Sequence, residues 1–185
     1  MRNQSELLIA EVQGHVARLT INRPDKRNAM TLGMWRDFGR HVDAWAGDRD
    51  IRVLVVAGAG DRCFCAGNDI KEAAEIRKTP AQRAAFSATV HATYDALKNF
   101  PKPTIARISG ICMGGGVELA LLCDLQIAGA DAQFAIPPAN LGIGYKLDDI
   151  KLLLESISAK HAKQLLFTAE RIGALEALEW GLVNQ

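Results

Sequence analysis

The chain has 185 residues, of which 49% are hydrophobic and 23% charged, and its formal net charge is +1. This length and composition suit one globular domain with a sizeable core, and we treat residues 1–185 as a single domain. Balanced charge without a basic block argues against a nucleic-acid partner. The lack of a long apolar run or a secretory h-region argues against a membrane partner and favours a cytoplasmic protein.

The four cysteines are expected to be reduced. Cys63 and Cys65 are one residue apart, which is too close for an ordinary disulfide, while Cys112 and Cys123 lie far along the chain. A C-x-C pair without a second pair or a nearby histidine is a poor zinc signature. We therefore predict no metal site.

Strand and helix patterns alternate in the first half of the chain. Residues 6–12 and 15–21 are short β-type runs on either side of a Gln-Gly turn, which predicts a hairpin. After a turn-rich loop at 22–30, Thr31 is a candidate N-cap of a helix. The apolar run at 51–60 is typical of a strand that is buried on both faces.

The second half continues the alternation. A polar segment becomes briefly helical before residue 79, where Thr79 caps a long helix with proline at its first position. The segments that follow are a strand (102–110), a helix (117–124), a strand (125–130), a short strand or turn (132–138) and three helices (147–156, 158–167 and 173–181). An α/β layered domain is the expected class.

Two segments share the order strand, glycine loop, helix start. They are LVVAGAGDRCFCAGNDIKE and TIARISGICMGGGVELA. Such turns leave backbone N–H groups free at the helix N-terminus, and two of them could form an oxyanion hole around one oxygen atom. Glycine turns that serve packing alone remain the alternative. No G-x-G-x-x-G, G-x-x-x-x-G-K-[ST], G-x-S-x-G or H-E-x-x-H motif occurs.

The same segments resemble a known family. FCAGNDIKE and KPTIARISGICMGGGVELALLCDLQIA are similar to the two signature segments of the crotonase (enoyl-CoA hydratase/isomerase) superfamily, and LTINRPDKRNAM resembles its first CoA-contacting loop. The resemblance implies a spiral of ββα units and an acyl-CoA thioester substrate, with no cofactor besides the CoA of the substrate. The family's C-terminal trimerisation helices have no counterpart here. We therefore expect a truncated chain whose full-length form is a homotrimer or a dimer of trimers.

The resemblance also implies a site. The thioester oxygen would accept hydrogen bonds from the backbone N–H groups of Asn68 and Gly115, which stabilise the enolate. Losing one such donor typically raises a barrier by about 3–4 kcal/mol. The residues that the resemblance places against CoA and substrate are Lys26, Arg27, Ala29, Ala66, Gly67, Asp69, Ile70 and Gly114.

Glu118 is the best acid–base candidate, because it matches the first of the two glutamates of the hydratases; the alternative is a solvated acid favoured by the helix dipole. The second glutamate should stand at position 138, which is proline. PPANLGIGYKL is similar to the corresponding segment of methylmalonyl-CoA decarboxylase, and this makes Tyr145 a second candidate. For Tyr145 the alternative is a buried ring whose hydroxyl bonds to backbone.

Three functions therefore remain open. An enoyl-CoA hydratase/isomerase-type lyase or isomerase comes first, a decarboxylase second, and a non-catalytic CoA-binding paralogue third. Cys65 is not expected to be a nucleophile, because the sequence places no histidine near it. We expect His91 to be a surface or packing residue and Asp149 to be a helix-capping acid.

Overall fold

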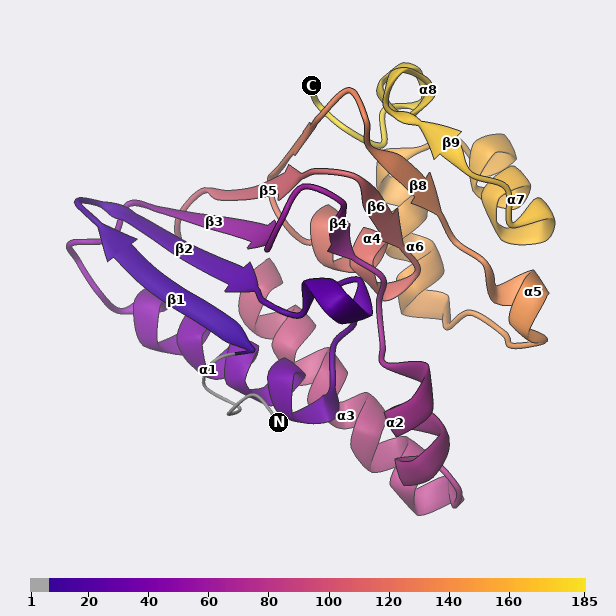
Figure 1. Cartoon of the computed structure of the whole chain (residues 1–185), viewed down its shortest axis with the longest axis horizontal. Coiled ribbons are helices and arrows are strands. Elements are labelled where there is room, and N and C mark those ends of the chain that lie inside the picture. Colours follow the sequence, from indigo (N-terminus) through magenta and orange to yellow (C-terminus); the bar gives the residue numbers. More distant parts are fainter. Residues whose placement is uncertain (1–6) are drawn as a thin grey trace.

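The computed structural model describes residues 7–185 (Figure 1). Residues 1–6, which include the start of the first expected strand and part of the segment without a secretory signal, lie outside the described residues. β1 (Leu8–Gln13) and β2 (Val16–Ile21) pair antiparallel around a turn in which Gly14 has a φ of 58°. The predicted hairpin is confirmed.

The hairpin begins a five-stranded sheet in the order β1-β2-β3-β5-β7. Its other members are β3 (Val53–Gly58), β5 (Thr104–Ile108) and β7 (Leu125–Ala128). All pairs after the hairpin are parallel. Parallel strands need covering on both faces, which explains the continuous apolar run around β3.

A second sheet has the order β4-β6-β8-β9. Its strands are β4 (Cys63–Cys65), β6 (Ile111–Met113), β8 (Gln133–Ala135) and β9 (Ile172–Gly173). The three strands of the first sheet that follow the hairpin are each succeeded by a short strand of the second: β3 by β4, β5 by β6, and β7 by β8. This repetition is the expected spiral of ββα units.

The sequence patterns missed β4 and β6 as separate strands. Residues 102–110 look like one strand, but the chain turns at Gly110, whose φ is 60°. A Cβ atom at Gly110 would lie 2.2 Å from the Arg62 carbonyl oxygen. The turn is therefore fixed by contact between two distant segments, which no local pattern reveals.

The helices around the first sheet begin where their caps predict. α1 (Leu32–Ala46) starts after Thr31, whose side chain accepts a hydrogen bond from the Met34 N–H. α3 (Pro80–Lys98) starts after Thr79, which forms a capping box with Gln82. α2 (Ile70–Ile76) lies between them in the sequence, and α1 and α3 pack against each other.

The remaining helices surround the second sheet and the end of the chain (Figure 1). They are α4 (Gly115–Leu121), α5 (Pro138–Leu141), α6 (Leu147–Ser156), α7 (Ala159–Thr168) and α8 (Ala174–Trp180); a 3-10 helix, η2 (Pro24–Lys26), lies in the early loop. α4 packs against β4, β6 and α6. α4 therefore contacts both the strands that adjoin the two glycine loops and α6, which comes later in the chain.

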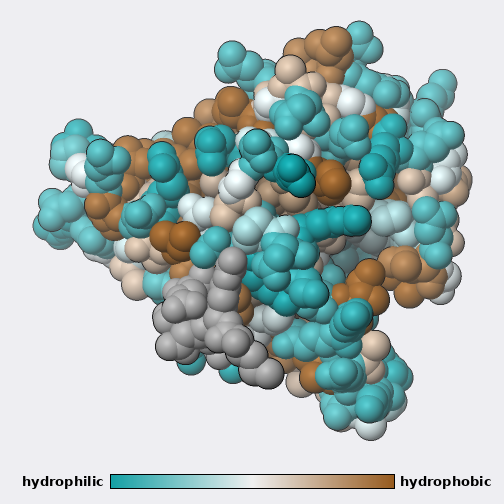
Figure 2. All heavy atoms as spheres, viewed as in Figure 1, coloured by the Kyte–Doolittle hydropathy of each residue, from teal (hydrophilic) through white to brown (hydrophobic). Residues whose placement is uncertain are grey.

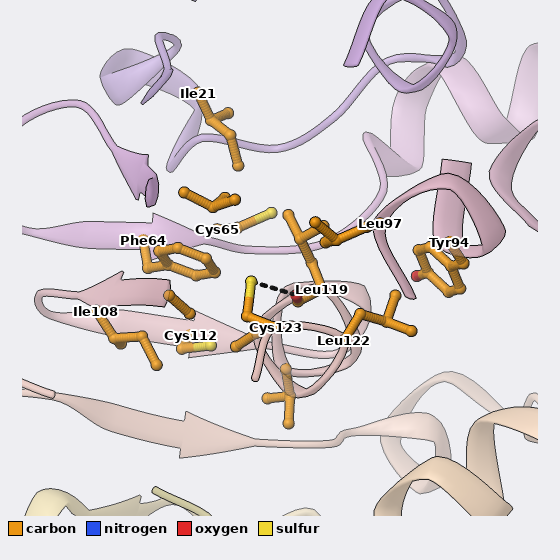
Figure 3. Packing of buried hydrophobic residues seen from close by; sticks show 14 of the residues in the cluster. Ile21, Phe64, Cys65, Tyr94, Leu97, Ile108, Cys112, Leu119, Leu122 and Cys123 are labelled. Carbon is orange, nitrogen blue, oxygen red and sulfur yellow. Dashed lines mark hydrogen bonds between the residues drawn. The ribbon is translucent and has the colours of Figure 1, made fainter. Parts of the chain in front are cut away.

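The core extends beneath both glycine loops. Phe64, Cys65 and Cys112 of the second sheet lie close to Leu119 and Cys123 at the end of α4, as Figure 3 shows. All four cysteines are free and buried. Apolar packing therefore fixes the backbone on which the candidate site is built.

The surface mixes polar and apolar side chains. Figure 2 shows apolar atoms around α5 and the segment after it, where Leu141 and Ile143 are exposed. No helix among residues 7–185 has the length and apolar character needed to cross a bilayer.

Candidate active site

The two glycine loops are in backbone contact. Gly67 has a φ of 84°, and a Cβ atom there would lie 2.9 Å from the Gly115 nitrogen. A Cβ atom at Gly116 would lie 2.1 Å from the Cys65 carbonyl oxygen. Only glycine allows this approach, so the residues expected to bracket the thioester oxygen come from loops that touch.

The local hydrogen bonds around Asn68 and Gly115 use the neighbouring amides. Gly115 is the first residue of α4, so its N–H has no partner inside the helix. The preceding amide, that of Gly114, donates to the Ala135 carbonyl at 2.9 Å. In the other loop, Met30 N–H donates to the Gly67 carbonyl and Asp69 N–H donates to the Met30 carbonyl, both at 2.8 Å. Strand amides alternate in direction, so the Asn68 N–H points away from Met30.

The Asn68 side chain has a structural function. Its Oδ1 accepts a hydrogen bond from Trp35 Nε1 at 2.8 Å, and Trp35 is fully buried in α1. This bond ties the first glycine loop to the helix beneath it. It also leaves the main chain of Asn68, rather than its side chain, as the group expected to contact a ligand.

Glu118 lies beside the second loop. The hydroxyl of Tyr94, in α3, donates a hydrogen bond to Glu118 Oε2 at 2.7 Å. A Cβ atom at Gly115 would lie 3.5 Å from the Tyr94 oxygen and 3.8 Å from Glu118 Oε2. The carboxylate therefore adjoins the amide that the sequence assigns to the oxyanion hole.

The surroundings of Glu118 favour its protonated form. Desolvation by burial raises its pKa above the ordinary value of 4.5, and the negative charge of Asp149 raises it further. Hydrogen bonds from Tyr145 and Tyr94 act in the opposite direction, as does the charge of Lys146. A carboxyl group balanced in this way can both take up and release a proton.

Both tyrosines stay protonated. Burial raises the pKa of Tyr94 and of Tyr145, and the charge of Glu118 raises both further. Tyr145 was one of the two sequence candidates, and the structure brings it to Glu118. Tyr94 was not a candidate, although its hydroxyl bonds directly to the Glu118 carboxylate.

The predicted CoA-contacting segments lie side by side. The Ala66 N–H donates to the Arg27 carbonyl at 3.1 Å, which joins the loop of Lys26, Arg27 and Ala29 to the first glycine loop. Lys26 and Arg27 are exposed, and the side chain of Ile70 is 67% exposed. These side chains are available to a ligand.

Asp69 differs from its neighbours because its carboxylate already has hydrogen-bond and ion-pair partners within the protein. It caps α2 by accepting from the Lys71 and Glu72 N–H groups, and it forms an ion pair with Arg23 at 3.0 Å. Burial alone would raise its pKa, but the hydrogen bonds to Glu72 N–H and Arg23 outweigh burial and lower it. Asp69 thus holds the loop in shape.

Position 138 carries no acid, as the sequence indicates. Pro138 is buried and begins α5.

Burial raises the pKa of the Cys65 thiol to about 12, so Cys65 is not a ready nucleophile. Within residues 7–185, no group of three or more His, Cys, Asp and Glu side chains is arranged to hold a metal ion.

Two neighbouring polar residues lie where the sequence places them and have further contacts as well. His91 is not only a packing residue, since its Nε2 lies 3.0 Å from Lys146 Nζ and its ring centroid 5.9 Å from that of Tyr94. Asp149 does lie in the first turn of α6, where it accepts from the Lys146 N–H, but its charge also reaches Glu118. The spacing of His91 and Tyr94 on one helix was a readable signal; the return of α6 to this place was not.

Comparison with known proteins agrees with this geometry. Residues 11–185 match the model of the family described as enoyl-CoA hydratase/isomerase. The chain belongs to this family. A solved structure titled as an enoyl-CoA hydratase/carnithine racemase from Magnetospirillum magneticum superposes with a TM-score of 0.93 at 30% identity, covering 96% of this chain and 67% of that one.

The family members with similar sequences carry more than one activity in their names. A short-chain-enoyl-CoA hydratase of Clostridium acetobutylicum is 35% identical over 96% of this chain and 67% of its own length. A mitochondrial Delta(3,5)-Delta(2,4)-dienoyl-CoA isomerase of Rattus norvegicus is 33% identical over 99% of this chain and 59% of its own length. The resemblance to methylmalonyl-CoA decarboxylase around Tyr145 gains no support from these comparisons and stays a prediction.

Proposed function

We propose that this chain acts on acyl-CoA thioesters by stabilising a thioester enolate between the amides of Asn68 and Gly115. The single observation that carries the proposal is the contact between Gly67 and Gly115, because it puts the two donor-bearing loops at one place. Preorganised main-chain donors stabilise negative charge without reorganising during the reaction.

Glu118 supplies the proton transfer in this proposal. For a double-bond shift it would take a proton from the carbon chain of the acyl group and return it at another carbon. For water addition it would take the proton from the attacking water and return it to the α-carbon of the enolate, while Tyr94 and Tyr145 hold its carboxylate in place. Its raised pKa makes the Glu118 carboxylate a stronger base than an ordinary glutamate. A reaction of the hydratase/isomerase type, such as water addition or movement of a double bond, is the first expectation.

CoA would lie along the joined segments at 26–30 and 66–70. The proposed contacts to its nucleotide are Lys26, Arg27 and Ala29, with Ala66, Asp69 and Ile70 near the adenine and pantetheine. Gly67 and Gly114 would admit the thioester closely. A homotrimeric or larger assembly and a cytoplasmic location remain predictions.

Decarboxylation is the second candidate, and Pro138 favours it. A reaction that releases CO₂ needs an electron sink and an orienting pocket, so it runs without the second glutamate. Tyr145 would then bond to the departing carboxylate or protonate the enolate. A CoA-binding protein without turnover is the third candidate.

Glu118→Gln tests the proposal. The purified protein is incubated with crotonyl-CoA, followed by loss of the conjugated thioester absorbance, and separately with methylmalonyl-CoA, followed by CO₂ release. We expect turnover with one of them and a loss of about 100-fold or more in Glu118→Gln, which is the usual scale for an acid–base residue.

Glu155→Gln is the matched control, because Glu155 is exposed on α6. It should keep the wild-type rate. Equal rates in Glu118→Gln and Glu155→Gln would contradict the role of Glu118. Binding of CoA esters without turnover of any of them would favour the non-catalytic alternative.

A further inference from the structure

The side chain of Arg23 joins the early loop, residues 23–30, to the first glycine loop. Its Nη1 donates to the Ala29 carbonyl at 2.7 Å and to Asp69 Oδ2 at 3.0 Å, and its Nη2 also lies 3.0 Å from Asp69 Oδ2. The two side chains of this ion pair are only 15% and 17% exposed, so salt screens it less than a pair on the open surface. One guanidinium group therefore holds a residue of each loop.

The two residues that Arg23 holds lie on either side of a main-chain bridge. Met30 pairs with Asn68 in a parallel bridge, and the Met30 carbonyl accepts from the Asp69 N–H at 2.8 Å. Ala29 comes directly before Met30 in the chain, and Asp69 comes directly after Asn68. Arg23 thus supports, from both strands of the bridge, the residue whose amide is the proposed donor to the thioester oxygen.

A second side chain fixes the middle of the early loop. Asn28 is fully buried and has a φ of 53°, in the left-handed region that asparagine adopts more readily than most residues. Its Nδ2 donates to the Cys63 carbonyl at 2.6 Å and to the Ala59 carbonyl at 3.1 Å, while its Oδ1 accepts from the Arg23 N–H at 2.9 Å. The exposed basic side chains of this loop are therefore carried by a backbone whose shape is set by the fold.

We propose that Arg23 is a positioning residue that makes the early loop and the Asn68 donor one unit, so that CoA bound along the loop places its thioester at the donor. The proposal rests on the proposed function, because it needs CoA at 26–30 and the thioester oxygen at Asn68. Arg23 acts through Ala29 and Asp69. Binding energy from the nucleotide, a part of the substrate remote from the reaction, is then used to orient the reacting group.

Arginine suits this task because its planar guanidinium offers several donors in fixed directions. A lysine at position 23 would keep the charge but has a single nitrogen, and a glutamine would keep a donor without the charge. Arg23→Lys and Arg23→Gln therefore form a graded pair of variants. Arg18→Gln is the matched control, because Arg18 is exposed on β2.

The first measurement compares two thioesters of whichever acyl group is turned over, crotonyl or methylmalonyl: the CoA ester and the pantetheine ester, which lacks the nucleotide. Arg23→Gln should lose about fivefold or more kcat/KM with the CoA ester beyond what it loses with the pantetheine ester, which is the lower end of usual couplings between two sites. Arg23→Lys should show a smaller difference, and Arg18→Gln should match the wild type. A residue that only supports packing would change both esters by the same factor.

The second measurement needs no turnover. Hydrogen exchange followed by mass spectrometry is recorded for peptides that cover residues 26–30 and 66–70, with and without CoA. In Arg23→Gln both segments should exchange faster than in the wild type, while a peptide from α7 keeps its rate. The affinity for CoA itself, measured by calorimetry, should fall by about fivefold or more.

Equal losses with the two esters, or unchanged exchange at either segment, would overturn the inference. Circular dichroism reports whether Arg23→Gln is folded, and Arg23→Lys carries the same comparison if it is not. If turnover depends on Glu118 but Arg23→Gln treats both esters alike, this inference alone fails. If both segments loosen while the wild type neither binds CoA nor turns over an ester, the proposed function fails and Arg23 is left as a structural link between the loops.

Discussion

The two halves of the candidate site are built differently. The half formed by the glycine loops consists of main chain, and Gly67 and Gly116 bring its segments closer than a side chain would permit. The half that holds the acid consists of side chains from α3, α4 and the segment that leads into α6, meeting around Glu118. Part of that segment is exposed, including Leu141 and Ile143.

This difference separates two tasks. Stabilising charge on a thioester oxygen needs donors at fixed positions, and main chain locked by packing provides them. Moving a proton needs an adjustable pKa, and neighbouring side chains provide that. We therefore expect substitutions in the glycine loops to abolish turnover. Substitutions around Glu118 should reduce turnover by degrees that depend on pH.

Gly116→Ala should have the largest effect. Its Cβ would lie 2.1 Å from the Cys65 carbonyl oxygen, and neither backbone can move without disturbing the core. We expect turnover to disappear and thermal unfolding to show a loss of about 3 kcal/mol or more.

Gly47→Ala is the control for this change, because nothing lies within 4 Å of a Cβ atom there and its φ of −84° suits alanine. It should leave both activity and stability within the experimental scatter. A fully active Gly116→Ala protein would show that the two loops are not locked together, and the contrast between the halves would be lost.

Tyr94→Phe should have an intermediate, graded effect. The Tyr94 hydrogen bond lowers the pKa of Glu118, so its removal raises that pKa further. A reaction that needs the Glu118 carboxylate would then lose rate at a higher pH than the wild type does. We expect the rate on the acidic limb of the profile to fall by up to about tenfold, the scale of one hydrogen bond, and to recover at more alkaline pH.

Tyr145→Phe sharpens this test, since Tyr145 is more exposed but acts on Glu118 with the same sign. Its shift should have the same direction. Should the pH–rate profile of Tyr94→Phe coincide with that of the wild type, Tyr94 would be a packing residue only.

The smallest effect concerns the thiols beneath the glycine loops. Burial raises the pKa of Cys63 to about 11 and that of Cys65 to about 12. Since the thiolate is the reactive form, the folded protein should resist alkylation by iodoacetamide at pH 7.5, whereas the urea-unfolded protein should react at all four cysteines. Rapid labelling of Cys65 in the folded state, measured by peptide mass spectrometry, would mean that the first loop opens.

Much of the site's main-chain half was readable in the sequence. The caps at Thr31 and Thr79, the hairpin and the order strand, glycine loop, helix are local patterns, and the structure contains each of them. Asn68, Gly115 and Glu118 were singled out by the family resemblance of the segments that carry those patterns. Their proximity follows from the spiral, which sets β4 beside β6.

The residues around the acid were only partly readable. Tyr145 was identified by resemblance, but Tyr94 lies 24 positions before Glu118 on a helix that looked like ordinary packing. His91 and Asp149 were assigned to a surface or packing position and to a helix cap. The place of His91 follows from its spacing to Tyr94 on α3, whereas the place of Asp149 depends on the return of α6 to α3 through Lys146.

The sequence by itself determined the local elements, their caps and the glycines that permit close approach, because these depend on hydrogen bonds and steric limits within a few residues. The tertiary structure alone decided where β4 and β6 separate, which side chains surround Glu118, and how its proton affinity is set. Those properties arise from burial and from charges contributed by residues far apart in the chain, and no local pattern encodes either.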